Sequence, residues 1–225
     1  MSSKPDLKLD WCSNEAATYA CKNWHYSESV PSWKKSRIGV WESGDFVGCL
    51  VFTNPMPPTV KRFRCKNTEI TELARVALRD HRSPVSRMIA IARKMLIRAN
   101  PRLLVMVSYA DTAQGHHGGI YQASGFGYYG KGKGTREFLY KGKWHHARSI
   151  GQDIKSGKLP KTAWQLPHRE SGAKHCYAML LGADRGYKIP MEQQPFPKRA
   201  RSIDSDAPGV QSGEGGATPT RALSG

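Results

Sequence analysis

The sequence is short of acidic residues and has no long apolar run. Aspartate and glutamate together number 18 against 35 lysines and arginines in 225 residues, which gives a formal net charge of +17. So large a positive excess favours polyanionic partners, and nucleic acid is the first class that it indicates. The most apolar segment, RLLVMVSYA at 102–110, is far shorter than the roughly 20 residues of a membrane-spanning helix. The charged start, MSSKPDLKLD, does not resemble a secretion signal either.

Cysteine is also sparse, and its spacing excludes two common frameworks. The five cysteines are odd in number and contain no Cys-x-x-Cys pair, so neither a set of disulfides nor a zinc knuckle is predicted. Unpaired cysteines are typical of a protein that works in a reducing cytoplasm.

The composition divides the chain into a globular part and a tail. With 39% hydrophobic residues, a chain of this length can bury one sizeable core. From about Met191 onward small residues and proline dominate, which predicts a low-complexity, disordered tail over residues 191–225. Residues 1–190 are expected to form one domain that ends in a β extension.

Hydrophobic periodicity and turn residues predict an α+β fold. Ser83 is the expected N-cap of the longest helix, with Pro84 in its first turn. In order, the expected elements are a strand at 7–12, a helix at 13–24, a hairpin at 37–53, a strand within 68–78, the long helix at 83–99, a strand at 102–110, a short helix at 115–125 and a hairpin at 135–150. This order resembles the GNAT acyltransferase superfamily, which implies a splayed mixed β-sheet flanked by helices.

An aromatic loop follows the first predicted helix. The segment NWHYSESVPSW contains a Trp-His-Tyr-Ser cluster that a plain surface loop does not need. Trp24 and Tyr26 are candidates to stack on a planar ligand, and Ser27 completes the substrate-binding group. His25 is a candidate acid, base or ligand near neutral pH. The alternative is that these aromatic side chains cap the core where the helix ends.

Polar residues also stand at the end of the buried strand. Ser108, Tyr109 and Asp111 occupy its carboxyl end, where open α/β sheets place their ligand crevices. Asp111 equally suits the N-cap of a following turn. In the GNAT superfamily a tyrosine on the next helix often protonates the departing thiolate, and the resemblance gives that role to Tyr121.

Two adjacent histidines follow this strand. Neighbouring residues on a helix point about 100° apart, so one metal ion would take only one of His116 and His117, together with Asp111 or His25. The sequence therefore leaves a metal, ferrous iron or another, as an open possibility.

The start of the long helix is a candidate anion site. In RDHRSPVSRM, the free amides of a helix N-terminus are joined by Arg82, Ser83, Ser86 and Arg87. The GNAT resemblance implies an acyl-CoA-type thioester donor here, although the spaced glycines of that superfamily are absent. An ordinary capped helix with a solvated basic face would have the same composition.

Three basic runs lie near the predicted cleft. Interleaved with aromatic residues, they suit a phosphate backbone with an exposed base. The runs are Lys34, Lys35 and Arg37; Lys61, Arg62 and Arg64; and Lys131, Lys133 and Arg136.

Five separated motifs together resemble the Mom family of phage DNA-modification proteins. They are NWHYSESVPSWKKSRIGVWESGDFVGCLVF, ELARVALRDH, SRMIAIARKML, VSYADTAQGHHGGIYQASGFGYYG and GKWHHARSIG, within residues 7–198. The resemblance implies a GNAT-like transferase in the host cytoplasm that converts adenine in double-stranded DNA to a carbamoylmethyl derivative at its exocyclic amine and so protects the DNA from restriction. It gives the active-site role to His25, Tyr26, Arg75, Ser86, Asp111 and Tyr121.

This chemistry leaves alternatives open. An enzyme that reaches an amine inside a duplex must extrude the base, and Trp24, Tyr26 and Tyr109 could stack on it. Direct attack of nitrogen on a thioester gives an amide, whereas the family's product is an alkylated amine, so the donor stays open. The competing hypotheses are an acyltransferase that acts on a tRNA or protein amine, and a non-catalytic basic DNA-binding protein.

Overall fold

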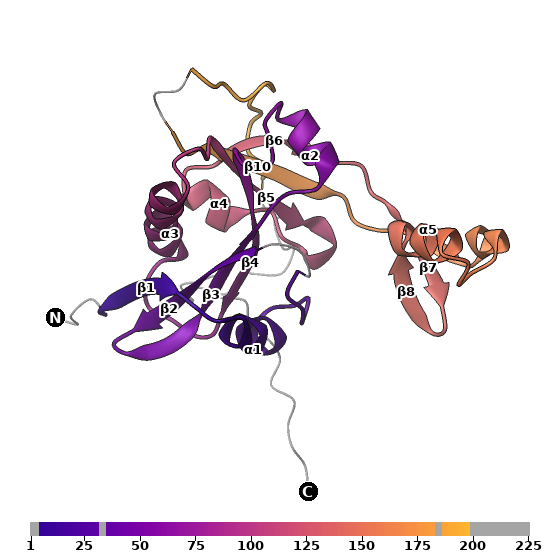
Figure 1. Ribbon diagram of the computed structural model, residues 1–225, viewed down its shortest axis with the longest axis horizontal. Helices are drawn as coiled ribbons and strands as arrows, with labels where there is room; N and C mark the ends of the chain where they lie inside the picture. The colour runs from indigo at the N-terminus through magenta and orange to yellow at the C-terminus, as the bar shows by residue number, and fades with distance from the viewer. Residues whose placement is uncertain (1–4, 32–34, 183–185, 199–225) are drawn as a thin grey trace, which may run out of the picture.

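The computed structural model describes residues 5–31, 35–182 and 186–198. A seven-stranded mixed sheet, in the order β1-β2-β3-β4-β5-β10-β6, forms the body, and a three-stranded sheet, β8-β7-β9, stands to one side (Figure 1). The strands are β1 Leu7–Trp11, β2 Lys35–Glu42, β3 Asp45–Thr53, β4 Ile70–Leu78, β5 Val105–Asp111, β6 Gly127–Lys131, β7 Arg136–Tyr140, β8 Lys143–His146, β9 His168–Glu170 and β10 Lys174–Leu180. The helices are α1 Asn14–Trp24, α2 Pro57–Arg62, α3 Val85–Ala99, α4 Gly119–Ala123 and α5 Ala147–Lys155, with 3₁₀ turns η1 Thr112–Gln114 and η2 Lys161–Gln165.

The first four strands form an antiparallel meander. Ser43 and Gly44 link β2 to β3 with φ angles of 51° and 91°, the positive values that a two-residue hairpin turn with the twist of its strands requires. The predicted hairpin at 37–53 is confirmed.

The sheet opens between β4 and β5. These strands are parallel but pair over only three residues each, Ile70–Glu72 with Val105–Val107. Beyond Glu72 and Val107 no ladder joins them, although the Ser108 hydroxyl still donates to the Leu73 carbonyl at 2.7 Å. The expected α+β class, with a splayed mixed sheet flanked by helices, is confirmed.

Helices cover both faces of the meander. In β3, alternate side chains enter two separate apolar clusters, with Leu50 and Phe52 toward α3 and Cys49 and Val51 toward α1. The buried helical residues are Met88, Ile89, Ala92 and Leu96 of α3, as the periodicity predicted, and Ala17, Ala20 and Cys21 of α1.

One helix cap is as expected and the other is not. The Ser13 hydroxyl accepts from the Ala16 amide at 3.1 Å and caps α1. For α3 the prediction was wrong by one residue, because Pro84 is the N-cap and Ser83 makes no capping bond. The cause is Glu42 on β2, whose carboxylate accepts from the Ser83 amide at 2.6 Å and holds that residue outside the helix.

The last strand lies inside the sheet rather than at its edge. β10 pairs antiparallel with both β5 and β6. After it the chain returns over the sheet, where the Gln194 amide donates to the Tyr128 carbonyl at 2.8 Å and Phe196 stacks on Tyr177. Residues 191–198, which composition assigned to the tail, thus pack on the body, while residues 199–225 lie outside the described residues.

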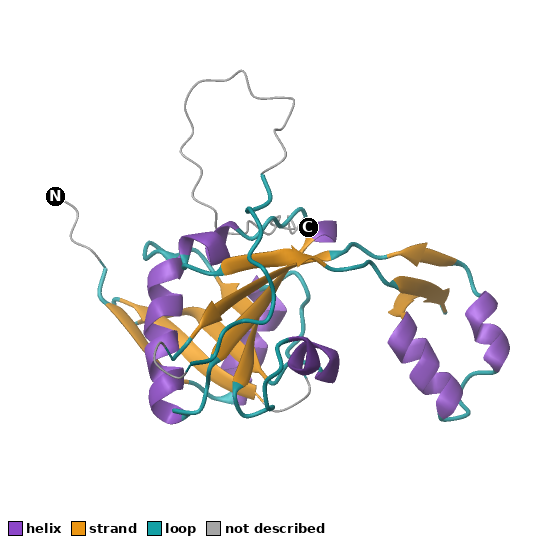
Figure 2. Cartoon of the chain, turned by 90° about the horizontal axis from the view of Figure 1, so that it is seen from above, coloured by secondary structure: helices purple, strands orange, loops and turns teal. Residues whose placement is uncertain are grey.

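A small module projects from the body. It comprises β7, β8, β9, α5 and η2 and has its own apolar cluster, formed by Phe138, Ile150, Leu159 and Ala163. Figure 2 shows two connecting segments that lead out to it from the main sheet. The predicted hairpin at 135–150 is confirmed as β7 and β8, whereas α2 and α5 were not predicted. Among the described residues, every helix is too short or too polar to span a bilayer.

Candidate active site

One loop, two strands and a short helix contribute polar side chains where β4 and β5 diverge. We call the group formed by His25, Tyr26, Glu72, Asp111 and Tyr121 the splay site. The loop after α1 supplies the first two residues, β4 the third, the end of β5 the fourth, and α4 the last. Four of the five were predicted from the sequence.

His25 is held as a neutral ring. Its Nδ1 accepts from the Ser27 amide at 3.1 Å and lies 2.8 Å from the Ser27 hydroxyl, which leaves the proton on Nε2. Burial lowers the pKa of His25 to about 4, with Arg75 and His116 adding positive potential. The ring therefore carries no charge at neutral pH, and Ser27 acts as the residue that orients it.

Arg75 secures the same loop to the sheet. Its Nε donates to the Ser29 carbonyl at 3.1 Å, and a terminal nitrogen donates to the Ala74 carbonyl at 2.8 Å. The guanidinium thus donates hydrogen bonds to backbone carbonyls, while its positive charge acts to lower the pKa of His25 and of Tyr26.

Tyr26 links the two loops of the site. Its ring stacks on His25 with centroids 4.4 Å apart and meets His116 edge-on at 5.4 Å. The side chain is half exposed, and burial together with the Asp111 carboxylate raises the pKa of Tyr26. A half-exposed ring beside a carboxylate can contact a planar substrate from one side.

Asp111 combines a capping and an electrostatic role. One carboxylate oxygen accepts from the Ala113 amide at 3.0 Å and caps η1, as the alternative interpretation held. The other lies 3.5 Å from the Lys174 ammonium of β10. The carboxylate remains beside Tyr26, so capping does not remove it from the site.

Tyr121 comes from α4 and packs against the core of the body. Burial raises the pKa of Tyr121 to about 12, and Tyr26 and Glu72 act in the same direction, while the nearby Ser108 hydroxyl acts against them. The phenol therefore stays protonated at neutral pH and is able to donate. Ser108, a predicted substrate-binding residue, is fully buried, and its hydroxyl donates to the Leu73 carbonyl at 2.7 Å.

Glu72 was missed by sequence reasoning. Burial raises the pKa of this carboxyl, against the positive charges of Lys174 and Arg75. A glutamate inside the strand segment TEITELARVAL breaks its apolar pattern, and that break is the signal that could have identified it. A carboxylate with a raised pKa is a stronger base than an ordinary surface glutamate.

Two of the predicted substrate-binding aromatics, Trp24 and Tyr109, make packing contacts within the body. Trp24 is packed against the core, with Tyr19 edge-on at 5.3 Å and Phe46 at 6.0 Å. Tyr109 points to the face opposite Ser108, because successive strand residues alternate, and its hydroxyl lies 2.9 Å from that of Thr59 in α2. The alternative, that an aromatic caps the core at the helix end, holds for Trp24.

The two adjacent histidines do not lie on the helix that the prediction had assumed. His116 and His117 lie in the loop between η1 and α4, not on a helix. His116 approaches Tyr26, whereas the backbone carbonyl of His117 accepts from Tyr177. Among the described residues, no group of three or more histidine, cysteine or acidic side chains gathers as metal ligands.

A cavity of about 530 Å³ lies beside the start of α3. Arg82, Ser83 and Ser86 contribute to its lining as predicted, and Gly119, Ile120 and Ala123 of α4 form the other side; Arg87 is exposed and is not part of the lining. Because α4 also carries Tyr121, this cavity and the splay site share one short helix.

The backbone amides beside the cavity differ in whether they are already bound. The amides of Arg82 and Ser83 are already bound by the Glu42 carboxylate at 2.9 and 2.6 Å. The first two amides of α3, at Val85 and Ser86, have no acceptor within the helix and remain for a phosphate.

The predicted DNA-binding residues are distributed unevenly. Lys35 and Arg37 are half buried and donate to the Pro31 and Cys12 carbonyls, and Lys34 lies outside the described residues. Lys131 and Lys133 are exposed on the segment that leads to the module, while Arg136 pairs with Glu170 at 3.5 Å.

Comparison with known proteins gives one family. The model of the Mom protein family matches residues 6–198. Methylcarbamoylase mom of Escherichia phage Mu is 30% identical over 158 residues, which are 68% of this chain and 65% of that protein. The chain thus spans slightly less than two thirds of the length of this relative.

Solved acetyltransferase structures resemble the chain at 10% sequence identity. Spermidine/spermine N-acetyltransferase SpeG from Vibrio cholerae matches with a TM-score of 0.45, over 78% of this chain and 92% of that one. A GNAT family acetyltransferase from Elizabethkingia anophelis with acetyl-CoA bound matches with a TM-score of 0.42, over 77% and 97%.

Proposed function

The chain belongs to the Mom protein family, and we propose that it is a phage DNA-modification transferase that acts on the exocyclic amine of adenine in double-stranded DNA. The main support for this proposal is the match of the family model over residues 6–198, a range that includes every residue of the splay site. The proposed product is the carbamoylmethyl derivative, made in the host cytoplasm, where it would protect the DNA from restriction.

The chemistry requires removal of a proton from a weakly nucleophilic nitrogen. The lone pair of an exocyclic amine is delocalised into the ring, so a base that acts as the new bond forms lowers the barrier. Glu72 is the proposed acceptor of this proton, since burial makes its carboxylate more basic. Asp111, fixed between the Ala113 amide and Lys174, is proposed to accept a hydrogen bond from the amine and orient it.

The aromatic loop would hold the extruded base. Opening a base pair costs a few kcal/mol, which stacking and edge contacts must offset. Tyr26, half exposed over His25, supplies the stacking surface, and the neutral His25 ring can donate through Nε2 to an adenine ring nitrogen. Arg75 keeps this loop in place from beneath.

The donor would approach from the side of α3. Because the product is an alkylated amine, the bond that forms joins the amine nitrogen to a methylene carbon of the donor, and the bond that breaks joins that carbon to the donor's leaving group. An anionic group elsewhere on such a donor would suit the free amides at Val85 and Ser86. Tyr121 on α4 stays protonated, so its hydroxyl can transfer a proton to a departing group at the splay site.

The test is nucleoside mass spectrometry of plasmid DNA from cells that express the protein. We expect a new deoxyadenosine derivative heavier by a carbamoylmethyl group, absent from cells that express the Glu72→Gln variant at equal level. DNA with unaltered nucleosides, or a mass change found only in tRNA or protein from the same cells, would overturn the proposal.

A further inference from the structure

The projecting module carries a large share of unpaired positive charge. Residues 133–172 contain nine lysines and arginines against three acidic residues, and all nine basic side chains are exposed. Arg136 pairs with Glu170, and Arg169 with Glu137. Among the described residues, the other seven basic side chains of the module form no ion pair. They are Lys133, Lys141, Lys143, Arg148, Lys155, Lys158 and Lys161.

The module is built as a separate unit. Its apolar cluster draws only on residues 138–166, so it adds nothing to the core of the body. In Figures 1 and 2 it stands away from the main sheet at the end of two connecting segments. A self-packed projection with mutually repelling surface charges gains stability when a polyanion neutralises them.

The aromatic residues of the module indicate which part of a nucleic acid it meets. Trp144 and Trp164 are exposed, but Arg169 lies over the Trp144 ring at 4.3 Å, and Trp164 meets Phe138 edge-on at 5.3 Å. A stacking platform for bases needs an open ring face. Each indole thus has a partner within the module, whereas seven of its basic side chains form no ion pair with any residue that the structure describes, and these charged groups suit phosphates.

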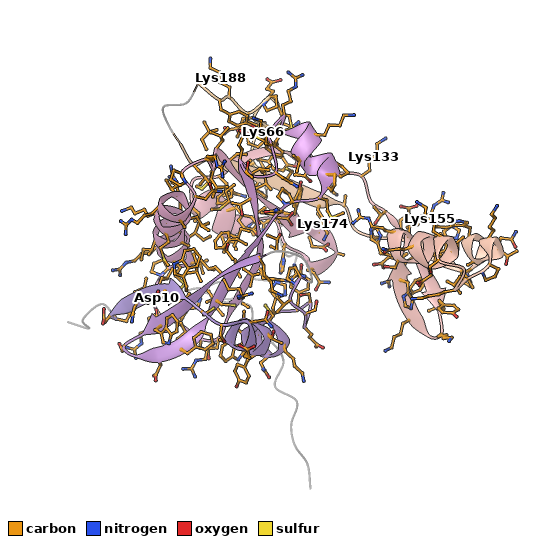
Figure 3. The ribbon with its side chains drawn as sticks, in the orientation of Figure 1. Asp10, Lys66, Lys133, Lys155, Lys174 and Lys188 are labelled. Atoms are coloured by element: carbon orange, nitrogen blue, oxygen red, sulfur yellow. The ribbon has the colours of Figure 1, made fainter. Side chains whose placement is uncertain are left out.

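The connecting segments lead back to the splay site. Lys131 ends β6 and Lys174 begins β10, and the Lys174 ammonium lies 3.5 Å from Asp111. Figure 3 shows Lys133 on one connection and Lys174 where the other joins the body, with Lys155 on the module. A backbone that contacts the module and these lysines passes beside the site where the base is proposed to react.

We propose that residues 133–172 form a holding module that grips the phosphate backbone of duplex DNA on one side of the target adenine. The inference rests on the proposed function for the identity of the target, and on the charge and construction of the module for the contact. The strands and helix of the module would then supply affinity, while the body supplies chemistry.

The test compares two full-length variants that lose the same charge. One carries Lys141→Gln, Lys143→Gln, Lys155→Gln and Lys158→Gln in the module. The control carries Lys66→Gln, Lys94→Gln, Arg98→Gln and Arg102→Gln on the body. All eight side chains are exposed, so both variants should fold, which circular dichroism and thermal melting verify.

Binding is measured with a 30-base-pair duplex over a range of salt concentrations. Each lost phosphate contact flattens the slope of log affinity against log salt by about 0.9. We expect the module variant to flatten it by roughly 2 to 4 and to weaken binding at least tenfold at 0.1 M salt, and the control variant to flatten it by less than about 1. Equal slopes for the two variants would overturn the inference.

Two further measurements distinguish this inference from binding to another nucleic acid and from the proposed function. Tighter binding of the wild-type protein to the single strand, or to tRNA, than to the duplex would overturn the assignment to duplex DNA. Binding needs no turnover, so wild-type protein that grips the duplex through the module but alters no nucleoside would overturn the proposed function and leave this inference standing.

Discussion

At the scale of single residues, a substitution of Asp111 can distinguish its capping role from a role in the chemistry. Asp111→Asn keeps an oxygen that caps the Ala113 amide, so the free energy of unfolding should shift by no more than about 1 kcal/mol. Loss of the carboxylate should lower adenine modification at least about a hundredfold. Lys174→Met is the matched control, because it breaks only the ion pair. Equal activities of the two variants would show that Asp111 merely holds β10.

Tyr121 offers a test that removes a single atom. Tyr121→Phe keeps the ring contacts with Tyr177 and Phe126 and loses the hydroxyl. If the phenol donates a proton, the modification rate should fall by about 10² to 10⁴, with DNA affinity unchanged. Nucleoside mass spectrometry over a time course measures this rate, and a rate within about threefold of the wild type would remove Tyr121 from the chemistry.

His25 should make stability depend on pH. Its folded pKa is about 4 against an ordinary 6.5, so between these values the unfolded chain binds a proton that the folded chain refuses. The free energy of unfolding should therefore fall as the pH drops from about 6.5 toward 4. His25→Asn keeps an acceptor for the Ser27 amide and cannot titrate, so its urea midpoint should fall less between pH 7 and pH 5. Parallel losses in both proteins would contradict the assignment.

At the scale of elements, one carboxylate fixes the turn before α3. Burial opposes ionisation of Glu42, but hydrogen bonds from the Arg82 and Ser83 amides outweigh it and lower the pKa of the carboxyl. This stabilisation is present above the ordinary value of 4.5 and is lost as the pH falls through the lowered value. Glu42→Gln should cost about 1 to 3 kcal/mol at pH 7.

The cost of Glu42→Gln should shrink in acid. Urea unfolding of the wild type and the variant at pH 7 and pH 3 measures this difference, since protonated Glu42 is itself neutral. The same difference at both values would show that shape rather than charge holds the turn.

The elements show how far sequence patterns reach. Local signals were sufficient for α1, the β2–β3 hairpin and α3, because Ser13, the Ser43–Gly44 turn and the apolar stripe of α3 lie within their own segments. The position of β10 between β5 and β6 was not predictable, because it depends on partners more than 40 residues away. The same limit explains Glu72 and Glu42, whose roles depend on Lys174 and Ser83.

At the scale of the whole molecule, the boundary of the folded part can be tested by truncation. A chain that ends at Lys198 should keep its stability and DNA modification, because the residues removed are poor in apolar side chains. A chain that ends at Pro190 loses the Gln194 bridge and the Phe196 contact with Tyr177, and should melt several degrees lower. Equal melting temperatures for the two truncations would show that residues 191–198 contribute nothing.

The central place of β10 also sets the order in which the chain can fold on the ribosome. β6 ends at Lys131, but its partner strand β10 ends at Leu180. β6 therefore has no partner strand while the residues between the two strands are translated. The intervening module has only local contacts and can fold at once. Because Lys174 meets Asp111 through this last strand, the ion pair beside the splay site forms only after β10 has been translated.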